Sequence, residues 1–526
     1  MSTLIGRQTA GNFEQSLAFF SSALFHQVQT SGLFTDSKHF ADATPKTDWD
    51  EIYQQYEQQS ASGHFKLAEF VEQYFSFPEP IKLAENVRYQ TVAEHIEALW
   101  SLLQKQPDVD SKDSLLPLRF PYLVPGGRFR EIYYWDSYFT SLGLLSSGRK
   151  ELVKSMVLNF IQLQKDIGCI PNGNRSYYFS RSQPPVLGLM VDMLFKSEGN
   201  YKDLDFLKEC VEAMDSEYAF WMAGAEQLSE PFQTHRRSVR MPNGGILNRY
   251  WDEQACPRAE SYAEDIDSAE HKKDHEKSTF YRHIRAACES GWDFSSRWLA
   301  DPEDLQSIQT TDIIPVDLNC LLYQLEVLLS QYWDLLGQKS KSQLYQQKSE
   351  TRKVTIQSYF WDSTDNFYRD FNLKTTSQSA VMSLAGVLPL FVNLANHEQA
   401  EAVASRLENE FLCAGGLLTT LCQSSQQWDA PNGWAPLHWF AVKGLQQYQQ
   451  NELATRIMQN WLANVEHYFQ AHGSLMEKYN VKEIDHVAQG GEYEVQHGFG
   501  WTNGVTSAFY QLMESSQPKL ELPNLK

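Results

Sequence analysis

Leucine recurs at intervals of three and four residues in the stretch Leu318-Asn-Cys-Leu-Leu-Tyr-Gln-Leu-Glu-Val-Leu-Leu329. Residues three and four apart lie on the same side of an α-helix, so this spacing gathers the leucines on one broad face. A helix with such a face is stable only when the face packs against other apolar surface. The stretch therefore predicts a helix buried against neighbouring helices.

The same periodicity extends along most of the chain. Thr91-Val-Ala-Glu94 has the form of a capping box, which marks the start of a helix. Sustained alternation is scarce, so we expect only a few short strands or hairpins, for example near Gly244–Trp251. Helical spacing occurs near residues 13–28, 92–103, 136–147, 152–163, 184–196, 204–223, 281–299, 318–329, 343–358, 380–396, 398–410, 435–449, 453–468 and 503–514. Paired helices arranged around a ring would bury all these faces, and the sequence therefore predicts an all-α fold.

No linker rich in proline or glycine divides the chain into separate domains. We expect an N-terminal helix and arm over residues 1–62 that wraps a helical barrel. The barrel itself is expected over residues 63–517, with a loose tail at 518–526. The highly charged stretch 262–277 is interpreted as a solvated loop.

Composition limits the ligands that the chain can bind. The 526 residues carry a formal charge of −21, and 42% of them are hydrophobic. Strong acidity argues against nucleic acid and against anionic membranes, whereas a neutral ligand is compatible with it. No run reaches the roughly eighteen apolar residues that a membrane-spanning helix needs. Nothing predicts an exposed helix-pairing seam, so we expect a monomer.

Two features bear on cellular location. The seven cysteines are odd in number and form no CxxC pair, a usage typical of free thiols in a reducing compartment. Residues 1–11 lack a basic segment followed by an apolar run, so we expect no signal peptide. Together these features predict a cytoplasmic protein.

Four segments combine glycine and aromatic residues with Asp, Glu, Arg and Asn. They are residues 125–138, residues 171–184, residues 257–261 with 289–295, and residues 476–480 with 490–501. Carboxylates and amides bind vicinal hydroxyl groups, arginine presents a planar fork of donors, and aromatic rings cover the apolar faces of a sugar. These segments therefore suit a neutral ligand rich in hydroxyl groups, but they do not name a reaction.

Two stretches of the chain, one of them the first of these segments, resemble the signatures of a known enzyme family. The first signature of the trehalases, PGGRFxExYxWDxY, is matched by Pro125-Gly-Gly-Arg-Phe-Arg-Glu-Ile-Tyr-Tyr-Trp-Asp-Ser-Tyr138. The second, QWDxPxGWxP, is matched by Gln427-Trp-Asp-Ala-Pro-Asn-Gly-Trp-Ala-Pro436. Segments 29–38, 285–298 and 315–319 are similar to the family as well, so that the resemblance covers about residues 24 to 514.

The resemblance implies an (α/α)6 barrel with long active-site loops. It implies hydrolysis of α,α-trehalose to two glucose molecules, with water as co-substrate, inversion at the attacked carbon, and neither a cofactor nor a metal. Asp293 would be the general acid and Glu477 the general base. The implied substrate contacts are Arg128, Trp135, Asp136, Asn172, Arg181, Ser182, Gln183, Arg258, Ala259, Glu260, Gly291 and Glu492.

Both implied roles place demands on the surroundings of the carboxyl groups. The acid must keep its proton near neutral pH, and Trp292 and Phe294 offer Asp293 an apolar environment that raises its pKa. An inverting mechanism predicts a carboxyl separation of roughly 6.5–9.5 Å, which leaves room for water. Without the resemblance, Asp293 would be interpreted as a helix N-cap, and Glu477 as a solvated residue beside Lys478.

Two features depart from the family's pattern, and two further residues are expected to have a structural role. The glycine run at 488–491 is shorter than the family's, and His497 replaces an expected acidic residue, differences that bear on loop closure. Asp429 and Trp434 are expected to brace the barrel rather than to contact substrate. Two alternative functions stay open: a barrel glycosidase acting on another α-glucoside, and a catalytically silent trehalose-binding protein.

Overall fold

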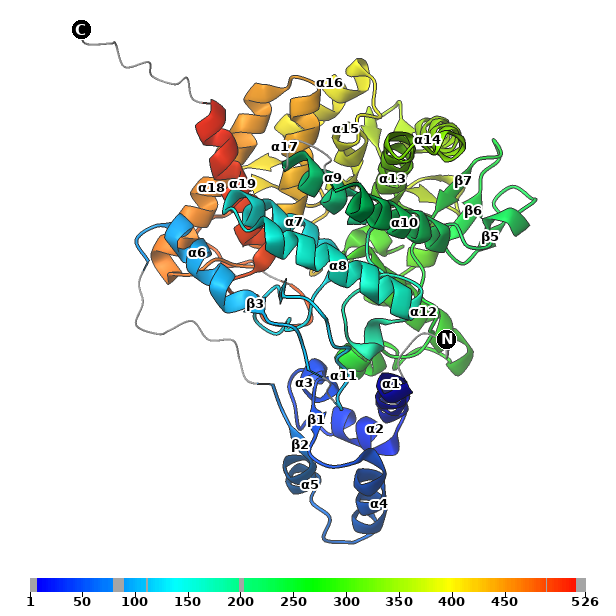
Figure 1. Ribbon diagram of the computed structural model, residues 1–526, viewed down its shortest axis with the longest axis vertical. Coiled ribbons are helices and arrows are strands. Elements are labelled where there is room, and N and C mark those ends of the chain that lie inside the picture. The colour runs from blue at the N-terminus through cyan, green and yellow to red at the C-terminus, as the bar shows by residue number, and fades with distance from the viewer. Residues whose placement is uncertain (1–6, 79–88, 110–111, 198–202, 489, 517–526) are drawn as a thin grey trace.

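The computed structural model describes residues 7–78, 89–109, 112–197, 203–488 and 490–516 (Figure 1). The predicted tail at 518–526 and Gln489 lie outside the described residues. The α-helices are α1 (Arg7–Phe20), α2 (Ala23–Thr30), α3 (Ser37–Ala41), α4 (Trp49–Ser60), α5 (Leu67–Tyr74), α6 (Val92–Leu103), α7 (Tyr134–Ser146), α8 (Lys150–Ile167), α9 (Leu187–Ser197), α10 (Leu204–Trp221), α11 (Tyr262–Ser268), α12 (Asp274–Ser290), α13 (Val316–Leu335), α14 (Lys339–Phe360), α15 (Leu388–Phe391), α16 (His397–Arg406), α17 (Ala435–Gln447), α18 (Asn451–His472) and α19 (Gly500–Ser516).

Among the described residues, six helices form an inner ring: α7, α9, α13, α15, α17 and α19. Each packs against the next along the chain, and α19 returns to pack along α7, which closes the ring. The helices α6, α8, α10, α14, α16 and α18 alternate with them in sequence and cover the outside, as α8 and α10 do in Figure 1. The predicted (α/α)6 barrel is confirmed.

Two glycines allow the ring to close. A Cβ atom on Gly504 would lie 2.1 Å from the carbonyl oxygen of Phe139, and one on Gly143 would lie 2.7 Å from the Cα of Gly504. The backbones of α7 and α19 therefore touch, which no side chain larger than hydrogen permits at these positions.

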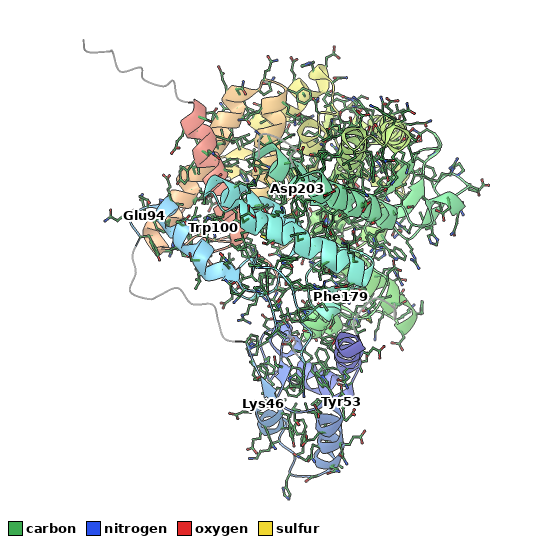
Figure 2. All side chains as sticks on the ribbon, in the orientation of Figure 1. Lys46, Tyr53, Glu94, Trp100, Phe179 and Asp203 are labelled. Carbon is green, nitrogen blue, oxygen red and sulfur yellow. The ribbon has the colours of Figure 1, made fainter. Side chains whose placement is uncertain are left out.

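The barrel core is one continuous apolar cluster. The leucines of the stretch 318–329 are all buried in it, on α13. Trp100 on α6 is fully buried as well (Figure 2), and its indole N–H donates to Ser147 Oγ at 3.2 Å. The apolar stripes of the sequence thus correspond to faces of the core.

The helices α1 to α5 form a lobe at one end of the barrel (Figure 1). The lobe has its own apolar cluster, built on residues such as Phe25, Phe40 and Trp49. Tyr133 and Tyr178, which come from barrel loops, belong to the same cluster. The lobe therefore packs on the loops at that end of the barrel, while the predicted boundaries at residues 62 and 517 stay predictions.

The strands are short and pair in antiparallel fashion. The hairpin predicted near Gly244–Trp251 is confirmed, because β6 and β7 pair across the turn at 241–245. The strands are β1 (Thr44–Pro45), β2 (Phe75–Ser76), β3 (Gln104–Lys105), β4 (Tyr122–Leu123), β5 (Thr234–His235), β6 (Ser238–Arg240), β7 (Ile246–Asn248), β8 (Ile313–Ile314), β9 (Trp361–Asp362), β10 (Phe367–Tyr368), β11 (Phe371–Asn372), β12 (Ser377–Gln378), β13 (Leu412–Cys413), β14 (Gly416–Leu417), β15 (Asn432–Gly433) and β16 (Tyr479–Asn480).

Three local predictions were wrong in part. The helix expected over 281–299 ends at Ser290, because Gly291 adopts a left-handed φ of 75° and turns the chain into a loop. The helix expected over 380–396 is reduced to a 3₁₀ turn and the four-residue α15. The charged stretch 262–277 is not a solvated loop, since it contains α11 and the start of α12, and its Asp265 is buried.

The capping box at Thr91 is displaced by one residue. Thr91 Oγ1 accepts from the N–H of Glu94 at 3.2 Å, as predicted. The Glu94 carboxylate (labelled in Figure 2) accepts from the N–H of Gln90, at 2.9 Å, rather than from Thr91. Across the described part of the chain, the helices are too short or too polar to cross a membrane.

Candidate active site

A pocket of about 650 Å³ lies at the end of the barrel where the inner helices begin. The lobe packs on the loops that surround it. The lining residues are Arg128, Phe129, Tyr133, Trp135, Asp136, Asn172, Tyr178, Arg181, Gln183, Arg258, Glu260, Ser261, Cys288, Gly291, Asp293, Gln427, Trp428, Trp434, Glu477, Glu492, Tyr493, Phe499 and Trp501. They come from positions 128 to 501, so the fold gathers segments that are far apart in the sequence.

The pocket brings together twelve of the fourteen residues that the resemblance implied. The two that do not line it are Ser182 and Ala259. The Ser182 hydroxyl donates to the backbone carbonyl of Ile170 at 2.5 Å, and the carbonyl of Ala259 accepts from Gln29 in the lobe at 3.2 Å. In this structure Ser182 and Ala259 therefore fix the loops whose adjacent residues line the pocket.

Asp293 follows α12 in the loop that Gly291 opens. A Cβ on Gly291 would lie 2.7 Å from the ring of Trp135, so glycine is needed for the loop to approach this tryptophan. Trp292 and Phe294 are buried on either side of Asp293, as predicted. Asp293 is not a helix cap, because the following turn is capped by Ser295, whose side chain accepts from the N–H of Arg297.

The surroundings of Asp293 favour its protonated form. Burial raises the pKa of the Asp293 carboxyl to about 7, although the positive charge of Arg258 opposes the shift. The negative charge of Glu492 adds to it. Near neutral pH a large fraction of Asp293 therefore holds a proton, as a general acid requires.

Glu477 enters the pocket from the loop after α18. Strand β16, two residues further on, pairs with β15 in the second signature and so fixes this loop. Glu477 Oε1 accepts from the hydroxyl of Tyr493 at 2.9 Å, whereas the buried Oε2 has no hydrogen-bond partner among the described residues. The interpretation of Glu477 as solvated is wrong, because the residue is 1% exposed.

The pKa of Glu477 is raised by burial, against the influence of Lys478 and of the Tyr493 hydrogen bond. Lys478 is itself buried, and its Nζ donates to Gln427 Oε1 at 2.7 Å and to the carbonyl of Gly490 at 2.8 Å. Gln427 in turn donates to the backbone carbonyl of Asp293. One chain of contacts thus joins the loops of the two carboxylates.

Each of the three pocket arginines is paired with at least one carboxylate. Arg128 pairs with Asp36 of the lobe. Arg181 Nη2 donates to Glu260 Oε1 at 2.6 Å, and Arg258 Nη2 donates to Asp265 and Glu492. Because paired guanidinium groups keep several N–H donors free, such pairs can hold an arginine in place while it binds a further acceptor.

Asp136 is the third carboxyl group near the two proposed catalytic ones. Burial raises its pKa well above the usual range, and the charges of Glu477 and Asp293 raise it further. Burial and the neighbouring carboxylates therefore favour the protonated form of Asp136, the form that can donate a hydrogen bond.

Four tryptophans line the pocket, and of these only Trp135 was predicted as a substrate contact. Trp428 stacks on Trp434 with ring centres 3.9 Å apart, and Trp135 and Trp501 adjoin Trp428 at 5.9 and 6.2 Å. Both rings of the stacked pair belong to the second signature, which was the signal available in the sequence. Trp434 thus lines the pocket as well as bracing it.

Asp429 braces the site from behind. Its carboxylate accepts from the hydroxyls of Ser295 and Ser296, at 2.8 and 2.9 Å, and from that of Thr420 at 2.9 Å. It also accepts from the backbone N–H of Ser296 at 2.8 Å. Asp429 does not line the pocket, so its contacts tie the Asp293 loop to the second signature. His497 is exposed and does not line the pocket either, and its influence on loop closure stays a prediction.

A deep pocket of carboxylates, arginines and tryptophans inside an (α/α)6 barrel is the arrangement of a glycoside hydrolase. The family model described as Trehalase matches residues 32–514. The chain belongs to the trehalase family, whose reaction is the hydrolysis of α,α-trehalose to glucose.

Individual relatives agree with this assignment. The chain is 44% identical over 491 residues to the periplasmic trehalases of Salmonella paratyphi B and Salmonella agona, covering 93% of this chain and 85% of each relative. Among solved structures, the neutral trehalase of Saccharomyces cerevisiae superposes with a TM-score of 0.62 at 27% identity, over 75% of this chain and 73% of that one. A mannosylglycerate hydrolase from Thermus thermophilus shares the fold, with a TM-score of 0.54 at 16% identity, over 80% of this chain and 100% of that one.

These relatives overturn the predicted cytoplasmic location, because they are named periplasmic trehalases. The cysteines misled the prediction for a physical reason. Four of the seven free thiols, those of Cys169, Cys210, Cys288 and Cys320, are buried. A buried thiol packs as a small apolar side chain, so its free state follows from packing and not from the compartment.

Proposed function

We propose that Asp293 and Glu477 hydrolyse trehalose by general acid and general base catalysis with inversion. The observation that carries this proposal is the unlike surroundings of two carboxyl groups in one pocket. Burial and the charge of Glu492 raise the pKa of Asp293 to about 7, whereas Lys478 and the Tyr493 hydrogen bond favour the ionised form of Glu477, whose buried Oε2 has no hydrogen-bond partner among the described residues. Groups with these properties suit an acid and a base that act in the same step.

In the proposed reaction, Asp293 gives its proton to the oxygen that links the two glucose units. Glu477 Oε2 takes a proton from a water molecule, and the water oxygen attacks the anomeric carbon from the opposite face. The bond to the bridging oxygen breaks as the new carbon–oxygen bond forms. Asp136, whose surroundings favour its protonated form, donates a hydrogen bond to a sugar hydroxyl, and the paired arginines supply further donors.

The proposal extends to the partners and location of the protein. We propose that the protein acts as a monomer, because one chain supplies both proposed catalytic carboxyl groups. The names of the relatives support a periplasmic location.

Proton NMR of a trehalose digest at early times tests the reaction. Inversion turns the attacked glucose into the β anomer and releases the other as α, so we expect equal amounts of the two. Two α-glucose molecules would mean retention and would exclude the proposed roles. Maltose and kojibiose serve as control substrates, and faster hydrolysis of either would favour the alternative of another α-glucosidase.

A further inference from the structure

The segment 29–38 matches the family, yet the reaction described above gives it no role. In the structure this segment runs from the end of α2 to the start of α3 in the lobe. Its polar side chains reach barrel loops that carry pocket residues. Gln29 Nε2 donates to the carbonyl of Ala259 at 3.2 Å, and Ser37 Oγ donates to Glu264 Oε2 at 2.7 Å.

Asp36 makes the most specific of these contacts. Arg128 Nε donates to Asp36 Oδ2 at 2.8 Å, and Arg128 Nη2 donates to Asp36 Oδ1 at 2.6 Å. This bidentate geometry fixes the plane of the guanidinium group, because two parallel hydrogen bonds allow no rotation. The Arg128 side chain is 15% exposed and that of Asp36 is 34% exposed, so the guanidinium group is the more shielded partner of the pair.

Arg128 also contacts the base through one intermediate. Its guanidinium carbon lies 4.5 Å from the centre of the Tyr493 ring, and the Tyr493 hydroxyl donates to Glu477 Oε1 at 2.9 Å. The backbone N–H of Arg128 donates to Gln496 Oε1 at 2.8 Å. The pocket loop at Arg128 is therefore fixed, and the side chain takes its direction from Asp36.

The charge of Asp36 matters because Glu477 attracts the same guanidinium group. Arg128 already lowers the pKa of Glu477 through its positive charge. An arginine side chain has several rotatable bonds, so removing its partner lets it move toward the next carboxylate. Movement toward Glu477 would place a cation against the base and remove a donor from the sugar.

We propose that Asp36, supplied by the N-terminal lobe, is a positioning residue that holds Arg128 in the geometry that binds substrate and keeps its charge from the base Glu477. The proposal rests on the proposed function of the pocket. It makes the lobe part of the working site, although the lobe lies outside the ring of helices.

The substitution Asp36→Asn isolates this role. Asp36 Oδ1 accepts from the N–H of Lys38 at 2.9 Å and so caps α3, and asparagine caps a helix equally well. In the variant, the asparagine Nδ2 takes the place of Asp36 Oδ2, so that an N–H donor faces the N–H of Arg128 Nε. The side chain also carries no charge. We expect KM for trehalose to rise about tenfold and kcat to fall by a smaller factor, because the contact to Arg128 acts mainly on binding and a cation closer to Glu477 makes it a weaker base.

The pH profile distinguishes positioning from a structural effect. Glu477 is faced by Lys478, Tyr493, Arg128 and Asp136. In Asp36→Asn the charge of Arg128 is no longer balanced, so it favours the ionised base more strongly. We expect the acidic limb of kcat/KM to move to lower pH, which a loss of fold alone would not cause.

A matched control comes from the same lobe. Asp48 occupies the N-cap position of α4 without a side-chain cap hydrogen bond, and it pairs with Lys112 at 2.5 Å in an exposed ion pair. Asp48→Asn should leave KM and the pH profile unchanged. Asp36→Glu keeps the charge and should restore part of the loss in Asp36→Asn.

A double-substitution cycle completes the test. If Asp36 acts only through Arg128, then Arg128→Ala and the pair Arg128→Ala with Asp36→Asn will have the same KM within about twofold. Independent, multiplying effects would overturn the proposal, as would an unchanged KM in Asp36→Asn. If Arg128→Ala itself leaves KM unchanged, Arg128 does not bind substrate and the proposal for Asp36 fails, whereas the NMR test of the acid and the base is unaffected.

Discussion

The Asp293 loop and the Glu477 loop carry similar acids into one pocket but give them unlike neighbours. Asp293 lies between two apolar rings, with Glu492 opposing its ionisation. Glu477 adjoins Lys478 and accepts a hydrogen bond from Tyr493, both of which favour its ionised form. Burial raises the pKa of both groups, so burial alone does not separate their roles. The neighbouring charges and donors make the difference.

The largest expected effect follows from replacing the carboxylate of Glu477. Glu477→Gln keeps the shape of the side chain but cannot take a proton from water. We expect kcat to fall by about 10⁴-fold on trehalose and by a similar factor on α-glucosyl fluoride, because both need an activated water. Steady-state rates on both substrates measure this. A kcat within about tenfold of the wild type would remove Glu477 from the role of base.

Replacing the carboxyl group of Asp293 should lower kcat by a factor that depends on the leaving group. Asp293→Asn cannot protonate the bridging oxygen, so we expect kcat on trehalose to fall by about 10³-fold. Fluoride leaves without protonation, so the loss on α-glucosyl fluoride should be about tenfold or less. Equal losses on the two substrates would contradict the assignment of Asp293 as the acid. Glu477→Gln, which loses activity on both, is the matched control.

The local patterns of the sequence predicted an all-α fold of paired helices around a ring, and the resemblance to the trehalases specified the (α/α)6 barrel. The stripe at 318–329 and its counterparts report which face of each helix is buried, and helical spacing alone reveals this. Ring closure was not predictable in the same way, because Gly143 and Gly504 meet only in the folded chain. The loop after Gly291 was missed as well, since an apolar run continues through Trp292 and Phe294 as it would in a helix.

The site was predicted through the resemblance and not through physical patterns. From its local sequence alone, Asp293 would be interpreted as a helix cap, and only the resemblance to the trehalases implies a catalytic role for it. Contacts between distant segments stayed hidden for the same reason as ring closure: Asp36 and Arg128 are 92 positions apart. Tyr493 was missed because a tyrosine is usually a core residue, and nothing local shows that its hydroxyl reaches Glu477.

A smaller effect should follow from releasing the Asp293 loop. Asp429→Ala removes the acceptor of the Ser295 and Ser296 hydroxyls and one of the two acceptors of the Thr420 hydroxyl. We expect a loss of about 3 kcal/mol in the free energy of unfolding and about a tenfold fall in kcat, since the acid is then less well placed. Chemical denaturation and steady-state kinetics measure these. The control Asp304→Ala removes an exposed turn cap and should change both far less.

The smallest expected effect concerns stability and its dependence on pH. The pKa of Asp293 is about 7 in the folded chain, against about 3.9 for an unfolded aspartate. Between these values the unfolded chain loses this proton while the folded chain keeps it, so stability falls as pH rises from about 4 to about 7. Asparagine at position 293 cannot ionise, so the variant does not lose stability over this pH range.

Asp293→Asn should therefore melt about 2 °C above the wild type at pH 8, and the difference should shrink toward zero as the pH falls to about 4. Differential scanning calorimetry across this range measures it. Glu477→Gln should gain less, because the Glu477 carboxylate keeps the Tyr493 hydrogen bond and the charge of Lys478 when it ionises. A difference in melting temperature that does not depend on pH would contradict the raised pKa of Asp293. A larger gain for Glu477→Gln than for Asp293→Asn would mean that the neighbouring groups do not favour the ionised form of Glu477 as the contacts indicate.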